Sequence, residues 1–425
     1  MGPPLARTAL TVAERAAFAG HVAALQAVLA GDPVASDPAL GTPWSLVYSG
    51  RASTRASGRA MQIQAAVTNA KGAPFQIETL ELGELADDEV LVEVRAAGIC
   101  HTDLIVRDQW YPVPLPAVLG HEGAGIVAQV GRAVSTVAPG DPVAMSFGSC
   151  GTCPTCRSGR PSYCHDFFAY NFAASRPDGS TALSRNGEAV HSHFFGQSCF
   201  ATHAVATERN VVPIPDDVPM SLVAPFGCGV QTGAGAVLNS LRAPAGSSIV
   251  VFGTGTVGLA AIMAARLAGL TKIIGVDVRA QRLLLAQELG ATHVVRPDSE
   301  DVREAIVAIT GSGADYALET TGVPAVLRAA VDCTAPAGQT GVIGAPAFGT
   351  EVSLDINTIL TAGRAIRGIV EGDSVPAIFI PRLLELWRQG SFPVDRLIST
   401  YDFDQIEQAA KHAETAEVVK AVVQM

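Results

Sequence analysis

Short apolar segments separated by glycine and proline dominate the chain from residue 61 to about residue 134. Residues 62–67 and 90–94 are mostly apolar or alternate between apolar and polar side chains, which is the pattern of strands with one buried face. The glycines and prolines between such segments favour turns. This part of the chain is therefore predicted to form an all-β domain.

The pattern changes after Cys228, where apolar strands begin to alternate with helical stretches. Residues 248–252 are almost wholly apolar, and residues 272–277, 314–319 and 340–344 continue the series of strands. Buried strands that alternate with helices are typical of a parallel sheet covered on both faces. The chain is therefore predicted to be an α/β protein, with a β domain followed by a doubly wound parallel sheet.

Three glycines follow the first of these strands in the spacing G-x-G-x-x-G: Gly253, Gly255 and Gly258. The spacing alone is weak evidence, but here it lies between a strand and a helix, and Asp277 ends the next strand. This context predicts a Rossmann dinucleotide site, in which the helix N-terminus faces the pyrophosphate. A carboxylate at Asp277 can bind both ribose hydroxyls and would repel a 2′-phosphate, so NAD⁺ is expected in preference to NADP⁺.

Composition excludes several classes of protein. The formal net charge of −11 argues against a nucleic-acid partner, and 425 residues with 16% charged side chains suit two or three compact domains. The longest apolar run, residues 249–270, is broken by Gly253, Gly255, Gly258 and Arg266, so no membrane span is expected. No secretory signal is apparent, and a cytoplasmic location is expected.

Four of the eight cysteines fall within fifteen residues: Cys150, Cys153, Cys156 and Cys164. Such spacing lets thiolates surround one ion, and a closed set of four sulfur ligands is typical of structural zinc. The alternative is a redox-active or disulfide-paired cluster. A reducing compartment favours the metal site.

A second candidate metal site is spread along the chain. Cys100 and His121 bracket a proline-rich loop, and a thiolate with an imidazole suits Zn²⁺. Cys228 is the best candidate for a third ligand, which would leave the fourth position for water or substrate. The alternative is a buried thiol and a hydrogen-bonded core histidine.

Residues Gly120-His121-Glu122, followed by Gly125, Gly131 and Val134, reproduce a known signature. From about residue 61 onward the chain resembles the medium-chain zinc-dependent alcohol dehydrogenases. The resemblance implies a GroES-like catalytic domain (61–229) with a structural zinc lobe (about 148–166), a Rossmann NAD-binding domain (230–370) and a return to the catalytic domain (371–425). It also implies two zinc ions per chain, NAD, and a homodimer or homotetramer.

The resemblance assigns further roles in the site. Glu122 would be a carboxylate near the catalytic zinc that ligates it transiently, and Asp103 would accept the N–H of His121. Thr102 would begin a proton relay, but Ile105 stands where the family places the terminal histidine, and His101 replaces a family arginine. His101 could contact the pyrophosphate, act as the missing base, or only pack. The resemblance also places four residues at the cofactor: Thr232, Arg282, Ile343 and Lys420.

Three segments narrow the resemblance to the aryl-alcohol (benzyl alcohol) dehydrogenase branch: residues 178–184, 193–202 and 229–236. That branch implies oxidation of primary aryl alcohols to aldehydes. Trp110 and Tyr111 would line the mouth of the substrate channel, with Phe147 beside them, although these aromatics could instead simply cap the barrel. The alternatives are an S-(hydroxymethyl)glutathione dehydrogenase, a terpenoid or aliphatic alcohol dehydrogenase, and a non-catalytic NAD-sensing relative.

Residues 1–60 do not share the resemblance. One helix is expected there, with Thr11 as N-cap and a stop at Gly31, and the rest is expected to be poorly ordered. The segment could be a targeting presequence or an upstream extension of the reading frame, with Met61 as the natural start.

Overall fold

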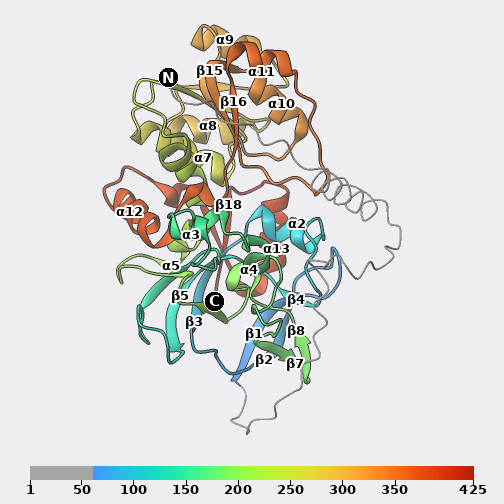
Figure 1. Cartoon of the computed structure of the whole chain (residues 1–425). Coiled ribbons are helices and arrows are strands. Elements are labelled where there is room, and N and C mark those ends of the chain that lie inside the picture. The colour runs from blue at the N-terminus through green and yellow to red at the C-terminus, as the bar shows by residue number, and fades with distance from the viewer. Residues whose placement is uncertain (1–60) are drawn as a thin grey trace, which may run out of the picture. The chain divides into compact units, whose positions relative to one another are not determined.

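The computed structural model describes residues 61–425, so the helix expected near Thr11 and the order of the extension lie outside the described residues. The described strands form three sheets (Figure 1). Two of them make up the predicted β domain, and the third is the predicted parallel sheet.

The β domain consists of a five-stranded sheet in the order β4-β1-β2-β7-β8 and a seven-stranded sheet in the order β10-β6-β5-β3-β18-β17, with β9 also pairing with β3. Strands β1 and β3 have buried apolar residues, such as Val67 and Val92, that share one core. The bounds of the strands are β1 (Met61–Thr68), β2 (Gln76–Leu82), β3 (Glu89–Gly98), β4 (Ala117–Val118), β5 (Glu122–Val130), β6 (Pro142–Met145), β7 (Leu183–Arg185), β8 (Glu188–Val190), β9 (His203–Thr207), β10 (Val211–Pro213), β17 (Ile398–Asp402) and β18 (Lys420–Gln424).

The third sheet has the order β13-β12-β11-β14-β15-β16, and all of its strand pairs are parallel. Numbered from β11, this is the order 3-2-1-4-5-6 of a doubly wound dinucleotide-binding sheet. Ile249 and Val251 belong to one apolar cluster and Val250 and Phe252 to another, so β11 is covered on both faces. The strands are β11 (Ser248–Phe252), β12 (Lys272–Val276), β13 (His293–Val295), β14 (Ala314–Glu319), β15 (Thr334–Val342) and β16 (Ala365–Gly368).

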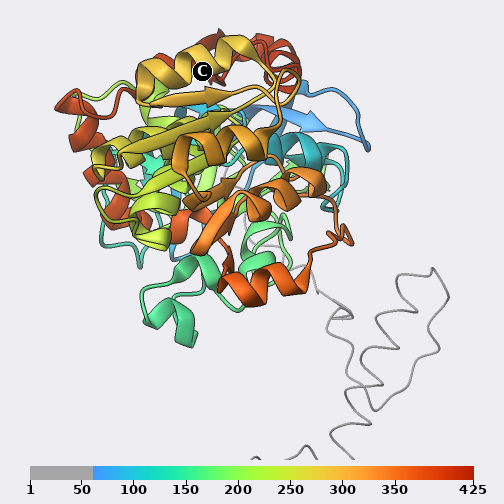
Figure 2. The ribbon, with the colours of Figure 1, turned by 90° about the horizontal axis from the view of Figure 1, so that it is seen from above.

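Helices cover this sheet, and α7 packs against α8 while α9 packs against α10 (Figure 2). The α-helices are α2 (His101–Arg107), α3 (Pro154–Arg157), α4 (Phe167–Asn171), α5 (Met220–Val223), α6 (Gly229–Gly235), α7 (Thr256–Leu267), α8 (Ala280–Leu289), α9 (Val302–Thr310), α10 (Pro324–Asp332), α11 (Ile356–Ala362), α12 (Pro376–Arg388) and α13 (Ile406–Glu414). Shorter helical turns are η1 (Pro161–Tyr163), η2 (Phe194–Gly196), η3 (Ala224–Gly227), η4 (Ala236–Leu241), η5 (Glu371–Asp373), η6 (Val394–Leu397) and η7 (Phe403–Gln405). The predicted fold class is confirmed.

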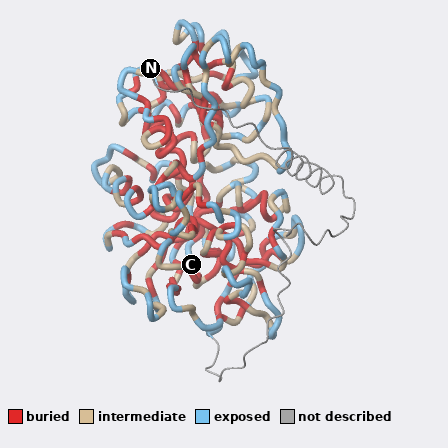
Figure 3. The backbone as a smooth tube through the Cα atoms, in the orientation of Figure 1, coloured by how far each residue is buried: buried red, intermediate tan, exposed pale blue. Residues whose placement is uncertain are grey.

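The end of the chain pairs with the β domain: β18 runs antiparallel to β3, with Val422 opposite Gly98. The buried residues run through both parts of the described chain (Figure 3). Among residues 61–425 no single helix is long and apolar enough to cross a membrane, although the bent pair Met220–Gly227 and Gly229–Leu241 passes that test on length and composition.

Candidate active site

Strand β3 leads directly into the first candidate metal ligand. Cys100 follows its last residues and is the N-cap of α2, and its backbone N–H donates to Asp103 Oδ2 at 2.9 Å. Asp103 sits in the first turn of the helix, where a carboxylate is favoured by the exposed backbone N–H groups. The short helix therefore fixes the cysteine at the end of a buried strand.

Asp103 also holds the second candidate ligand. Its Oδ1 lies 2.7 Å from His121 Nδ1 and accepts the backbone N–H of Gly120 at 3.2 Å. The contact predicted between Asp103 and His121 is confirmed, and it leaves Nε2 of the ring available as a ligand. This Nε2 atom is buried and has no hydrogen-bond partner among residues 61–425, which is costly unless a ligand binds there.

The third candidate ligand arrives from the distant junction of η3 and α6. One ligand atom from each of Cys100, His121, Glu122 and Cys228 lies within 4.8 Å of the others. A hydrogen bond from Cys228, together with the charges of His121 and Lys420, holds the pKa of the Cys100 thiol well below its ordinary value despite burial. Two sulfurs, an imidazole nitrogen and a carboxylate within this space fit a zinc ion.

Glu122 forms an ion pair that the sequence did not reveal. Lys420 Nζ lies 2.8 Å and 3.0 Å from the two carboxylate oxygens and 3.0 Å from the carbonyl oxygen of Ile99. A Cβ on Gly98 would lie 2.1 Å from Glu122 Oε2, so only glycine leaves room for this carboxylate. The ammonium group of Lys420 thus donates to Ile99 and Glu122, and the expected contact between Lys420 and the cofactor stays a prediction.

The four cysteines of residues 150–164 also come together, with their sulfur atoms within 4.8 Å of one another. The backbone N–H of Cys153 donates to Cys150 Sγ and that of Cys150 to Cys164 Sγ, both at 3.3 Å. A hydrogen bond with the Thr155 hydroxyl lowers the pKa of the Cys153 thiol to about 5. All eight cysteines are unpaired, and this cluster fits a closed structural zinc site.

Glu371 is a buried carboxylate beside Cys228 that sequence reasoning missed. Cys228 Sγ donates to its Oε1 at 3.4 Å, and Gln231 Nε2 and Thr232 Oγ1 donate to its Oε2 at 3.2 and 3.4 Å. Burial raises the pKa of Glu371 to about 7. Thr232, expected at the cofactor, is thus tied to the carboxylate next to a metal ligand.

The glycine-rich loop between β11 and α7 has the geometry of a dinucleotide site. A Cβ on Gly258 would lie 1.8 Å from the Gly253 carbonyl oxygen, so only glycine permits this close turn. Asp277 follows β12 and accepts the backbone N–H and the hydroxyl of Thr254 at 2.8 and 2.9 Å. The acid is therefore fixed beside the loop that would receive the pyrophosphate.

Two further residues were expected at the cofactor. Arg282 Nη1 lies 3.8 Å from the position that a Cβ would take on Gly255, which brings a positive charge to the loop. Ile343 follows β15, its backbone N–H donates to Glu319 O at 2.9 Å, and its side chain packs on an apolar cluster. The structure therefore brings Arg282 to the glycine loop and leaves Ile343 at the end of a neighbouring strand.

The start of the expected relay lies beside a metal ligand, since Thr102 Oγ1 is 3.8 Å from Cys100 Sγ. Ile105 is 2% exposed and belongs to the core, so no polar group continues the relay at that position. His101 is exposed at the start of α2, which argues against the packing role. Whether His101 contacts the cofactor pyrophosphate or acts as the base stays open.

Aromatic rings lead from the surface to His121. Phe348 is 60% exposed and Tyr111 is half-buried, and the Tyr111 hydroxyl donates to Pro346 O at 2.7 Å. The distances between ring centroids are 4.4 Å for Phe348–Tyr111, 5.6 Å for Tyr111–Phe172, 5.1 Å for Phe172–Phe195 and 4.5 Å for Phe195–His121.

The other two predicted pocket residues, Phe147 and Trp110, are not members of this series. Phe147 is 3% exposed and packs in the barrel core, with its ring centroid 6.1 Å from that of Phe167, and its expected place beside the channel mouth stays a prediction. Trp110 is 48% exposed and has no aromatic contact among the described residues. Phe172, Phe195 and Phe348 were not predicted as pocket residues, and no spacing rule could have identified them because they come from three separate parts of the chain.

The fold and these two donor sets define a two-domain zinc- and dinucleotide-binding dehydrogenase. Residues 86–216 match the alcohol dehydrogenase GroES-like domain, and residues 256–387 match the zinc-binding dehydrogenase family. A geraniol dehydrogenase from Castellaniella defragrans is 47% identical over 362 residues, which cover 85% of this chain and 97% of that protein.

Two solved structures are also similar. A benzyl alcohol dehydrogenase from Acinetobacter calcoaceticus is 47% identical with a TM-score of 0.84 and covers 86% of this chain and 99% of its own. An alcohol dehydrogenase zinc-binding domain protein from Burkholderia ambifaria is 52% identical with a TM-score of 0.85 and the same coverage. The chain belongs to the zinc-dependent medium-chain alcohol dehydrogenase family, and its cofactors are zinc and a nicotinamide dinucleotide.

Proposed function

We propose that this enzyme oxidises primary aryl alcohols of the benzyl type to aldehydes and transfers the hydride to NAD⁺, reversibly. The observation that carries the proposal is the continuous series of ring contacts from Phe348 to His121. Aromatic side chains bury a flat ring well, and offset or edge-to-face contacts add to the gain from burial. An aromatic alcohol moving along these rings would reach the metal-binding residues.

Cys100, His121 and Cys228 would hold the catalytic zinc, with Glu122 as a neighbouring carboxylate. The ion supplies Lewis acidity that favours loss of the alcohol proton, and the nicotinamide accepts the hydride. Asp103 keeps the His121 ring in one tautomer through the 2.7 Å contact at Nδ1. Lys420 keeps Glu122 in place through their ion pair.

Thr102 is proposed to relay the alcohol proton, with its hydroxyl accepting from the alcohol while donating its own hydrogen to the cofactor ribose, because its Oγ1 lies 3.8 Å from Cys100 Sγ. His101 follows Cys100 directly and is exposed, so its ring can exchange protons with water or contact the pyrophosphate. Asp277 is proposed to select NAD⁺, because a carboxylate fixed beside the glycine loop would repel a 2′-phosphate.

A terpenoid alcohol is the second candidate substrate. The similarity to a geraniol dehydrogenase favours it, since that relative is as similar to this chain as the benzyl alcohol dehydrogenase is. Steady-state formation of reduced nicotinamide with benzyl alcohol, geraniol, ethanol and S-(hydroxymethyl)glutathione separates the candidates. A kcat/KM for benzyl alcohol below that for geraniol or ethanol would contradict the aryl assignment.

Self-association into a homodimer or homotetramer is also proposed. Strand β16 ends the parallel sheet with all four residues exposed, and Ile356 and Leu360 on the adjacent α11 are 76% and 73% exposed. An exposed strand edge flanked by apolar side chains favours pairing with another copy. Sedimentation analysis tests whether the protein forms a dimer or a tetramer.

A cytoplasmic location is proposed because unpaired thiols at both metal sites suit a reducing compartment.

A further inference from the structure

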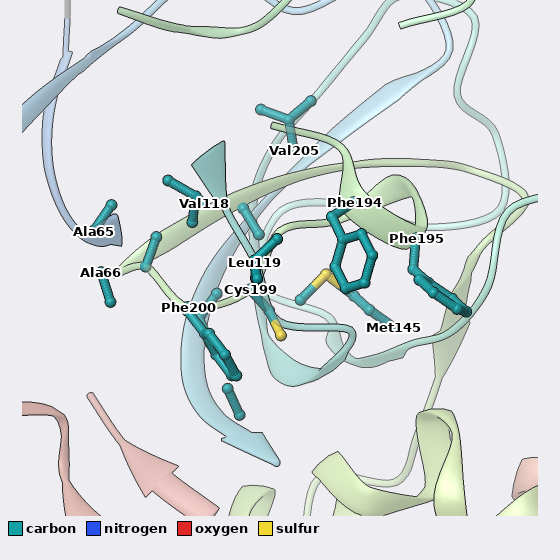
Figure 4. Packing of buried hydrophobic residues seen from close by; sticks show 14 of the residues in the cluster. Ala65, Ala66, Val118, Leu119, Met145, Phe194, Phe195, Cys199, Phe200 and Val205 are labelled. Carbon is teal, nitrogen blue, oxygen red and sulfur yellow. The ribbon is translucent and has the colours of Figure 1, made fainter. Parts of the chain in front are cut away.

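Residues 193–198 have an unusual backbone. His193, Phe195, Gly196 and Ser198 all have positive φ angles, of 68°, 50°, 63° and 53°. Residues other than glycine rarely adopt this conformation, and it persists only where the surroundings hold it. Phe194 and Phe195 lie with Met145 among the buried side chains drawn in Figure 4.

This segment contacts His121 in two ways. The Phe195 ring stacks on the imidazole with 4.5 Å between centroids and 29° between planes. Gln197 Nε2 donates to the carbonyl oxygen of His121 at 2.9 Å, and Gln197 Oε1 accepts the N–H of Gly123 at 3.1 Å. The position of the candidate zinc ligand therefore depends on the conformation of residues 193–198.

A buried charged cluster anchors the start of the segment. His193 Nε2 donates to Glu89 Oε1 at 3.2 Å, and Arg176 donates through Nε to Oε1 at 2.7 Å and through Nη2 to Oε2 at 2.9 Å. The backbone N–H of Ala86 adds a bond to Oε2 at 2.6 Å. Glu89 is 2% and His193 5% exposed, so hydrogen bonds between these groups replace their hydrogen bonds to water.

The cluster also connects the two elements that carry metal ligands. Glu89 is the first residue of β3, the strand that leads to Cys100. His193 begins the segment that contacts His121. None of the three cluster residues belongs to either donor set found among the described residues, so the zinc chemistry does not itself explain them.

We propose that Glu89, Arg176 and His193 form a positioning cluster that holds residues 193–198 in their left-handed conformation and thereby fixes His121 and Phe195. Retention of the catalytic zinc and preference for ring-bearing alcohols both depend on it. The second consequence rests on the proposed aryl substrate, whereas the first does not.

The test uses the zinc-loaded enzyme and the variants Glu89→Gln, His193→Leu and His193→Gln. Glu78→Gln is the matched control, because it removes the charge from another Glu–Arg pair of the same barrel, the 2.6 Å contact between Glu78 and Arg185. Three quantities are measured: the rate of zinc transfer to a chromophoric chelator, the ratio of kcat/KM for benzyl alcohol and ethanol, and the thermal midpoint.

In Glu89→Gln and His193→Leu, one of the two zinc equivalents should be lost roughly tenfold faster and the substrate ratio should fall about tenfold, the usual effect of removing a group behind a metal ligand. His193→Gln keeps an N–H donor for Glu89 and should lie closer to the wild type. The control should change neither quantity.

The proposal would be overturned if these variants had a lowered thermal midpoint but lost zinc at the same rate as the control and kept the same substrate ratio as the control. If Glu89→Gln does not fold, the comparison of His193→Leu with His193→Gln decides. If the wild type shows no preference for benzyl alcohol, the proposed substrate fails, and the chelator measurement alone decides on positioning.

Discussion

Lys420 and Glu122 form an ion pair of 2.8 Å with side chains that are only 3% and 0% exposed. Burial disfavours both charges, but Glu122 and the Cys100 thiol outweigh it and raise the pKa of Lys420. A buried pair of this kind is strongly destabilised when one partner is removed, because the other charge remains without compensation.

Lys420→Met should therefore lower the free energy of unfolding by about 3–5 kcal/mol, as measured by urea denaturation. The double variant Lys420→Met with Glu122→Gln should recover part of this loss, because no uncompensated charge remains. Equal stabilities of the wild type and Lys420→Met would show that the pair does not hold Glu122.

The two zinc sites should respond differently to loss of one cysteine. Cys228→Ala should leave one zinc ion per chain and abolish turnover, because it removes a ligand from the site beside Thr102 and the aromatic rings. Cys153→Ala should remove the other ion and chiefly reduce stability. Elemental analysis and thermal denaturation check both outcomes, and an active wild type with one zinc or none would contradict the assignment.

The preference of the enzyme for NAD⁺ over NADP⁺ tests the role proposed for Asp277. Its carboxylate is held by Thr254 at 2.8 Å, so a 2′-phosphate near it would meet a fixed negative charge. Asp277→Gly should raise kcat/KM for NADP⁺ relative to NAD⁺, and the ratio for the two cofactors is the measurement. A wild type that already uses both equally would remove the basis for this role.

Local sequence patterns predicted the parts of the site that are close in the chain. The four cysteines from Cys150 were identified by their spacing, and Gly253 to Gly258 by their spacing together with the strand before them and the helix after them. Glu371 was missed because only the fold places it beside Cys228, 143 residues away.

Two other residues show what residue spacing does not reveal. Phe147 lies three residues before Cys150, but that proximity does not say which side of the barrel its ring faces, and only the structure shows the ring in the core against Phe167. The resemblance places Lys420 at the cofactor, and only the strand pairing of β18 with β3 shows that its ammonium group also pairs with Glu122. Partners of a buried charge are set by tertiary packing, which residue spacing does not reveal.

The pH dependence of stability should reveal the ionised state of Glu89. Burial would raise its pKa, but the hydrogen bonds from His193 and Arg176 prevail and lower it from 4.5 to about 2. Because the folded value lies below the unfolded one, the carboxylate stabilises the protein above about pH 4.5, and this contribution is lost as the pH falls towards 2.

Glu89→Gln should therefore be less stable than the wild type at neutral pH, and the difference in their free energies of unfolding should narrow as the pH falls below about 4.5. Urea denaturation of both proteins across this range measures the difference. A difference that does not change with pH would mean that Glu89 is not ionised in the folded protein.

The last prediction concerns the aromatic series and the adjacent residues Trp110 and Tyr111, of which only Tyr111 belongs to the series. Tyr111 contacts Phe172 and Phe348, whereas Trp110 is 48% exposed and makes no ring contact among residues 61–425. We expect the wild type to favour benzyl alcohol over ethanol by at least ~100-fold in kcat/KM, which corresponds to about 2.7 kcal/mol of transition-state discrimination.

Tyr111→Ala should remove much of this preference, because it interrupts the series between Phe348 and Phe172 and also removes the hydrogen bond to Pro346. Trp110→Ala is the matched control at the adjacent position and should change the preference much less. Zinc content should be unchanged in both variants, since neither residue belongs to a donor set. Comparable turnover of ethanol and benzyl alcohol by the wild type would refute the aryl substrate and leave the alcohol dehydrogenase assignment intact, whereas a larger effect of Trp110→Ala would mean that substrate enters past the exposed indole.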